Sequence, residues 1–167
     1  MTRLLSRLAL LGFLLPAVLT AAPQARRELT LDAKKYAFHP TRIEAVEGDR
    51  VRIFVTNKLP EHTTIHWHGM ILPSGMDGVG GLSQPHIPVG KTFVYEFTLT
   101  KSGTFMYHPH ADEMVQMAMG MYGFWVTHPK DPNFMRVDRD FVFLLNNFDI
   151  EPGSATPKVN TMLDFNL

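Results

Sequence analysis

The sequence contains no cysteine in its 167 residues. The chain can therefore form no disulfide bond, and it can offer no thiolate to a metal ion or to a nucleophilic reaction. Its stability must come from an apolar core or from a bound metal. Hydrophobic residues make up 45% of the sequence, a proportion typical of a globular protein with a packed core.

The sequence also lacks an apolar run that is comfortably long enough to span a bilayer. The run at residues 8–19 is too short for that purpose, and it follows two arginines and precedes three small residues at 20–22. A basic segment, an apolar run and small residues in this order are typical of a secretory signal peptide, which we predict at residues 1–22. We expect an exported protein, either periplasmic or secreted. The open alternative is that this segment is retained as an N-terminal anchor.

Neither sign of charge is in excess, because the chain has 16 basic and 16 acidic residues. Binding to nucleic acid or to an anionic membrane surface usually depends on a strongly basic patch or domain. We therefore expect no nucleic acid among the partners, and no membrane once the signal peptide has been removed.

Sustained helical periodicity is nearly absent from residue 27 onward. Instead, apolar and polar residues alternate in short runs, as at Val51, Ile53 and Val55. Such alternation predicts a half-buried strand, and three further strands are predicted at 92–99, 103–107 and 122–127. Several short strands with turn residues between them favour an all-β sandwich or barrel.

One short helix is expected near residue 115, because Met114, Met117 and Met121 have the spacing of one helix face. We interpret these methionines as core residues that pack over the strands. A Cu(I) site made of their thioethers is the alternative. Asp112 and Glu113 could tune a nearby site, but acidic residues favour helix N-termini, and we interpret them as the start of this helix.

Two pairs of histidines are the strongest chemical signal in the chain. They occur as His66-Trp67-His68 and His108-Pro109-His110. Residues two apart in a strand point to the same face, so each pair can direct two imidazoles to one place. Four neutral imidazoles favour a transition metal, and the usual order of affinities favours Cu(II). The alternatives are structural strands or a zinc site.

The other four histidines have no such pairing. We interpret them as surface or loop residues, and His62 is the least certain of them because it closely precedes the first pair. The four are His39, His62, His86 and His128.

With their flanking residues, the two pairs resemble the copper-ligand motifs in the first cupredoxin-like domain of the multicopper oxidases, the laccase and copper-resistance oxidase family. The motifs are residues 64–69 and 103–110, and the similarity covers about residues 40–128. It also includes Asp77-Gly78, the segment 84–90 and the spacing of Gln116, Gly120 and Gly123. The resemblance implies an all-β fold, a cupredoxin-like Greek-key β-sandwich or barrel.

The resemblance also implies a role for each ligand. His66 would bind the type 2 copper of a trinuclear cluster, His68 and His108 would share one type 3 copper, and His110 would bind the other. In this family the cluster reduces dioxygen to water with electrons from a reductant such as a phenol or a metal ion. Asp77 corresponds to an acidic residue that would relay protons, although Asp-Gly is also an ordinary turn dipeptide.

The chain is expected to be part of a larger protein. We predict a first cupredoxin-like domain at 28–129, a linker at 130–138 and the incomplete beginning of a second such domain at 139–167, starting with an apolar strand at 141–145. The family's type 1 copper site needs a cysteine and is therefore absent from this chain. The remaining ligands would come from missing C-terminal domains or from a partner chain, so the isolated chain is predicted to be inactive.

Two alternatives stay open beside this oxidoreductase. One is a secreted cupredoxin-like module that binds or sequesters copper without catalysis. The other is a mononuclear cupin-type enzyme, which is disfavoured because no glutamate follows His68 at the short spacing that the cupin motif requires.

Overall fold

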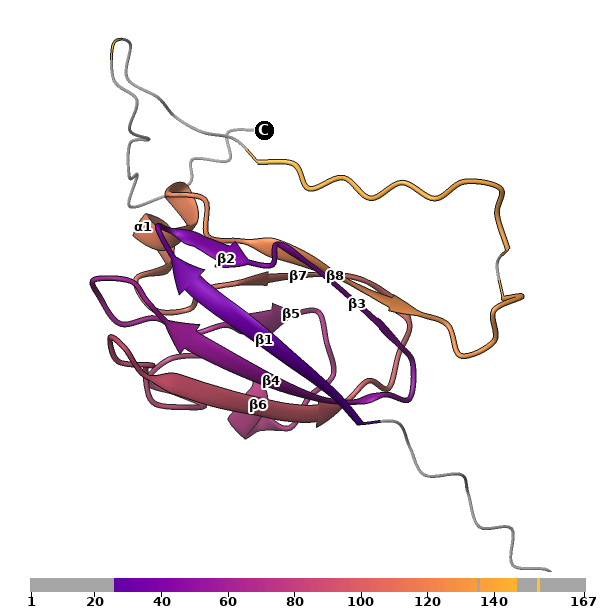
Figure 1. The fold of residues 1–167 in the computed structure, drawn as a ribbon, viewed down its shortest axis with the longest axis horizontal. Coiled ribbons are helices and arrows are strands. Elements are labelled where there is room, and N and C mark those ends of the chain that lie inside the picture. The colour runs from indigo at the N-terminus through magenta and orange to yellow at the C-terminus, as the bar shows by residue number, and fades with distance from the viewer. Residues whose placement is uncertain (1–25, 135, 147–152, 154–167) are drawn as a thin grey trace, which may run out of the picture.

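The computed structural model describes residues 26–134, 136–146 and 153, which form a two-layer β-sandwich (Figure 1). The predicted signal peptide and most of the predicted second domain lie outside these residues. Within the described part of the chain, the elements are β1 (Arg26–Lys34), β2 (Ala37–His39), β3 (Arg42–Val46), β4 (Arg50–Asn57), β5 (His66–His68), the 3-10 helix η1 (Ser74–Met76), β6 (Thr92–Thr98), β7 (Gly103–His108), α1 (Glu113–Ala118) and β8 (Gly123–His128).

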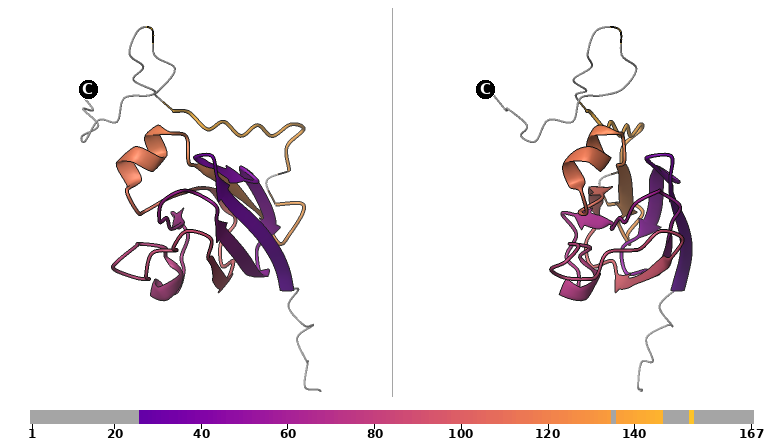
Figure 2. Two further views of the ribbon diagram at one scale, coloured as in Figure 1. Left: turned by 60° about the vertical axis from the view of Figure 1, so that its left-hand side comes forward. Right: turned by 90° about the vertical axis from the view of Figure 1, so that its left-hand side faces the viewer.

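The strands form two four-stranded sheets, with the orders β2-β1-β4-β6 and β3-β8-β7-β5. Figure 2 shows the sheets as two layers, with α1 at one end of the sandwich. Each sheet contains one parallel pair, β1 with β4 and β3 with β8, and its other pairs are antiparallel. The prediction of an all-β sandwich is confirmed.

The four strands predicted from alternation are present as β4, β6, β7 and β8. In β4, Val51, Ile53 and Val55 are fully buried, as the alternation predicts, and the residues between them are partly exposed. The strands β1, β2 and β3 were not predicted. In β1 only the second half alternates, with Leu31 and Ala33 fully buried.

Aromatic side chains fill the space between the sheets. Trp67 of β5 is fully buried and meets Tyr95 and Trp125 edge to face, with ring centroids 5.3 and 5.6 Å apart. Such contacts add to the free energy that burial of the rings contributes. Because Trp67 lies between His66 and His68 in the strand, its burial directs both histidines away from the core.

The predicted short helix is present, but it ends earlier than the methionine spacing suggests. α1 ends at Ala118, so Met121 lies beyond it and is buried in the core between the sheets. Within α1 the buried side chain is that of Gln116, while Met114 and Met117 are half-buried. The methionines therefore do not form one apolar helix face.

The predicted strand at 141–145 is not formed. Residues 141–146 belong to no helix or strand, and Phe141, Phe143 and Leu145 are 68%, 79% and 90% exposed. No neighbouring strand among the described residues pairs with this segment, and an apolar strand needs such a partner to bury its side chains. No helix in the described part of the chain has the length and apolar character needed to cross a membrane.

Candidate metal centre

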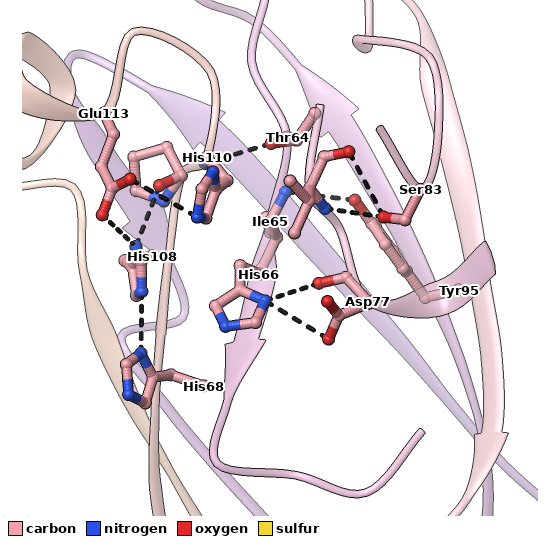
Figure 3. Close-up of polar contacts among 12 residues, drawn as sticks. Thr64, Ile65, His66, His68, Asp77, Ser83, Tyr95, His108, His110 and Glu113 are labelled. Carbon is pink, nitrogen blue, oxygen red and sulfur yellow. Dashed lines mark hydrogen bonds and ion pairs between the residues drawn. The ribbon is translucent and has the colours of Figure 1, made fainter. Parts of the chain in front are cut away.

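The first histidine pair is presented by β5 and the second by the end of β7. These strands pair antiparallel, with His66 opposite His108 and His68 opposite Met106. The rings of His66 and His108 lie with their centroids 5.3 Å apart. Figure 3 shows the four imidazoles gathered at this edge of the sheet. The strand geometry thus brings together residues that are forty positions apart.

Three of the predicted ligands form a compact group. One ring nitrogen from each of His66, His68 and His108 lies within 4.8 Å of the other two. His68 Nδ1 lies 3.2 Å from His108 Nε2. An ion held by imidazole nitrogens at about 2 Å separates two of them by about 3.3 Å at a tetrahedral angle. The nitrogen set and its spacing therefore fit a first-row transition metal such as copper.

Backbone carbonyl groups orient two of these rings. His66 Nδ1 donates a hydrogen bond to the carbonyl oxygen of Asp77 at 2.7 Å, and His108 Nδ1 donates one to that of Pro109 at 2.9 Å. A carbonyl oxygen only accepts, so the proton of each neutral ring resides on Nδ1. The lone pair of each ring is then on Nε2, where a metal can bind it.

His108 is the most deeply buried of the four histidines, with 3% of its surface exposed. Burial lowers its pKa below the ordinary value for histidine, and the nearby charges of His66 and His68 act in the same direction. The Pro109 carbonyl and Glu113 oppose this shift. His108 is therefore neutral near pH 7, which is the form that binds a metal.

His110 is near the group of three but does not belong to it. Its ring centroid is 5.4 Å from that of His66, and its backbone N–H donates a hydrogen bond to Thr64 Oγ1 at 3.1 Å. Its Nε2 lies 3.6 Å from Glu113 Oε2. The structure thus brings His110, the fourth predicted ligand, to the site. Its Nε2 faces the carboxylate of Glu113.

Glu113 is interpreted from the sequence as the start of the helix, with a role in tuning a nearby site as the alternative. It does begin α1, as predicted, but its carboxylate also faces the centre. Oε1 lies 3.5 Å from His108 Nδ1, while Oε2 is the oxygen near His110. Its spacing of three residues from His110 is the signal that could have indicated this contact.

Asp77 lies beside His66. Its backbone carbonyl accepts the hydrogen bond from His66, its Oδ1 is 3.5 Å from His66 Nδ1, and its side chain is 37% exposed. The next residue fixes this loop against the strand. Gly78 has φ +85°, and a Cβ added there would lie 1.6 Å from the carbonyl oxygen of Ile65. Only glycine permits so close an approach of the Asp77 loop to β5.

The remaining histidines lie at the surface, as predicted. His39, His62, His86 and His128 are all exposed. His128 Nε2 lies 2.9 Å from Glu44 Oε2 at the opposite end of β8 from the metal centre, and it takes no part in the group of three.

A family model described as Multicopper oxidase matches residues 29–132 of the chain. Copper resistance protein A from Escherichia coli is 39% identical over 120 residues, which cover 71% of this chain and 20% of that protein. Laccase-1 from Cryptococcus neoformans var. grubii is 43% identical over 94 residues, which cover 54% of this chain and 15% of that protein. The chain thus spans about a fifth or less of the length of these curated relatives.

Solved structures agree with these matches. A multicopper oxidase from Pseudomonas thermotolerans superimposes with a TM-score of 0.61 at 30% identity, over 65% of this chain and 31% of that one. A blue copper oxidase from Nitrosomonas europaea superimposes with a TM-score of 0.59 at 33% identity, over 64% of this chain and 40% of that one. The sandwich is therefore cupredoxin-like, as the motifs predict, and the chain belongs to the multicopper oxidase family.

Proposed function

We propose that this chain supplies half of the histidine ligands of a trinuclear copper cluster in a larger, exported multicopper oxidase. Such an enzyme would take electrons from a phenolic or metal-ion reductant and pass them to dioxygen. The convergence of ring nitrogens from His66, His68 and His108 within 4.8 Å is the observation that carries this proposal. Membership in the family supports copper as the metal.

The arrangement of the rings supports a division of the ligands. His68 Nδ1 and His108 Nε2 are close enough to share one type 3 copper, and His66 Nε2 would bind the type 2 copper. His110 would supply a ligand to the second type 3 copper. The remaining ligands and the type 1 site would come from C-terminal domains or from a partner chain. The isolated chain would then be inactive.

The bound cluster would supply the electrons that reduce dioxygen to water, and the protein must supply four protons for each dioxygen. Asp77 is suited to deliver protons, because its carboxylate is partly exposed and lies next to His66. The backbone of Asp77, and not its side chain, makes the short hydrogen bond to this ligand. The two roles of this residue can therefore be separated by mutation.

We expect Asp77→Asn to lower oxygen consumption by the full-length protein about a hundredfold, within the range for loss of a general acid. Copper content should stay unchanged, because the carbonyl that orients His66 remains. Oxygen uptake and copper analysis of the same samples measure both effects. Asp32→Asn is the control, because that carboxylate pairs with Lys58 on the other sheet. Full oxygen uptake in Asp77→Asn would remove this residue from the proton path.

Copper binding can be tested on the 167-residue chain itself. We expect His68→Ala to weaken the binding of the first Cu²⁺ ion at least tenfold, because the ion loses one of its imidazole ligands. The residue is exposed, so the fold should persist. Competition with a chelator of known affinity measures the change. His128→Gln removes an exposed imidazole remote from the centre and should leave the affinity unaltered.

Equal affinity in the wild-type chain and in His68→Ala would contradict the proposed centre. A sequestering module without catalysis would also bind Cu²⁺ through these histidines. Oxygen consumption by the full-length protein distinguishes the two functions. A sequestering protein would bind copper but consume no oxygen with a phenolic or metal-ion reductant.

A further inference from the structure

We infer that His62 and His86 form a second metal site, at the surface and outside the three-histidine group, that takes a divalent transition-metal ion such as Cu²⁺. Both side chains are exposed, and their ring centroids are only 4.5 Å apart with the rings tilted by 43°. Within the described part of the chain, no hydrogen bond or ion pair involves a ring nitrogen of either residue. Among the described residues these nitrogens therefore have no hydrogen-bonding partner, and His86 Nε2 lies against Gly80.

The backbone holds the two histidines on the same side of a local strand pairing. Thr63 and Ile87 form an isolated antiparallel bridge, with N–H to carbonyl hydrogen bonds of 3.2 and 2.8 Å in the two directions. His62 and His86 each precede one of these residues. In an antiparallel pairing such positions are diagonal neighbours on one face, at a separation that aromatic side chains can span.

Buried amide side chains fix both segments further. Asn57 Nδ2 donates hydrogen bonds of 2.8 Å to the carbonyl oxygens of Glu61 and Ile87, which are the neighbours of the two histidines. Gln116 Nε2 donates one of 2.9 Å to the carbonyl oxygen of His62. Asn57 and Gln116 are both fully buried. The backbone of the pair is therefore rigid before any metal arrives, which lowers the entropy cost of binding.

A glycine makes room for one of the rings. A Cβ added at Gly80 would lie 2.4 Å from His86 Cδ2 and 2.5 Å from its Nε2. The φ angle at this position is not one that requires glycine. The close approach of the His86 ring is thus the physical reason for a residue without a side chain at position 80.

The geometry and the donor set fit one ion bound by two imidazoles. His68 and His108, whose facing nitrogens are 3.2 Å apart, have ring centroids 5.5 Å apart. The centroids of His62 and His86 are 4.5 Å apart, and we expect a turn of the exposed His62 ring about its side-chain bonds to bring one nitrogen of each residue to a shared ion. Imidazole suits copper, zinc and nickel, and Cu²⁺ binds most strongly in the usual order. With only two protein ligands, water fills the other positions and the ion exchanges readily.

The test is the number of Cu²⁺ ions that the 167-residue chain binds in equilibrium dialysis. We expect both His62→Gln and His86→Gln to bind one ion fewer than the wild type. His128→Gln, which also removes an exposed imidazole, should bind the wild-type number. His68→Ala should weaken the first, tighter ion and leave the second. Failure of the three-histidine centre is thereby distinguishable from failure of this one.

A second measurement uses Zn²⁺, which is diamagnetic. Ring-nitrogen NMR signals of His62 and His86 should shift together as Zn²⁺ is added beyond the first equivalent, while those of His128 stay in place. A wild-type count of bound ions in both glutamine variants, or ring signals of His62 and His86 that do not respond to Zn²⁺, would overturn the inference and leave the two rings as a stacking contact only.

Discussion

In the proposed full-length oxidase, oxygen consumption is expected to fall to background when His68 is replaced by alanine. The Nδ1 atom of His68 lies 3.2 Å from His108 Nε2, where both would hold one copper ion. Alanine leaves that ion with an incomplete ligand set, and the fold should persist because His68 is exposed. An oxygen electrode with a phenolic reductant measures the effect.

The blue colour of the same variant should remain. That colour would come from a type 1 copper site, which needs a cysteine that this chain does not contain. His110→Ala should give the same result, and His128→Gln should consume oxygen at the wild-type rate. Continued turnover in both alanine variants would be incompatible with the ligand assignment.

Gly78→Ala is expected to give the largest loss of stability among single-methyl substitutions near the site. The added Cβ would lie 1.6 Å from the Ile65 carbonyl oxygen, and the backbone has φ +85°. A left-handed conformation costs about 1–2 kcal/mol for a residue other than glycine, and overpacking adds about 1–3 kcal/mol. We therefore expect the free energy of unfolding to fall by about 2–5 kcal/mol. Urea denaturation of the chain measures this change.

Gly90→Ala is the matched control. This glycine also has a positive φ, +72°, but a Cβ added there would have no atom within 4 Å. It should lose only the backbone cost of about 1–2 kcal/mol. Gly78→Ala should also weaken Cu²⁺ binding, because the Asp77 carbonyl moves away from His66. Equal stability losses in the two variants would show that the loop can move away from β5 at no cost.

The strands that the sequence predicts are those with strong alternation. β4 has three fully buried aliphatic residues in alternate positions, and β6 buries Tyr95 and Phe97 in the same way. β1 was not predicted because its first half is exposed and charged. It pairs in parallel with β4, which lies later in the chain. Local alternation does not report such long-range pairing.

The site was predictable to a similar extent. The two His-x-His pairs identify four residues, and the strand period explains why they share a face. The spacing of Glu113 from His110 hints at one of its two contacts, but the contact with His108 depends on where α1 lies relative to β7. The closeness of His62 and His86 was equally hidden, since it depends on buried hydrogen bonds from Asn57 and Gln116.

The order of strands in the second sheet has a consequence for how the protein matures. β7 lies between β5 and β8, and β8 in turn pairs in parallel with β3, which comes early in the chain. Pairing between segments that are distant in the sequence slows folding. β8 follows both histidine motifs in the chain, so the sheet that carries them is complete only after β8 has paired with β7 and β3. We therefore expect the folded sandwich to position the histidines before copper binds them.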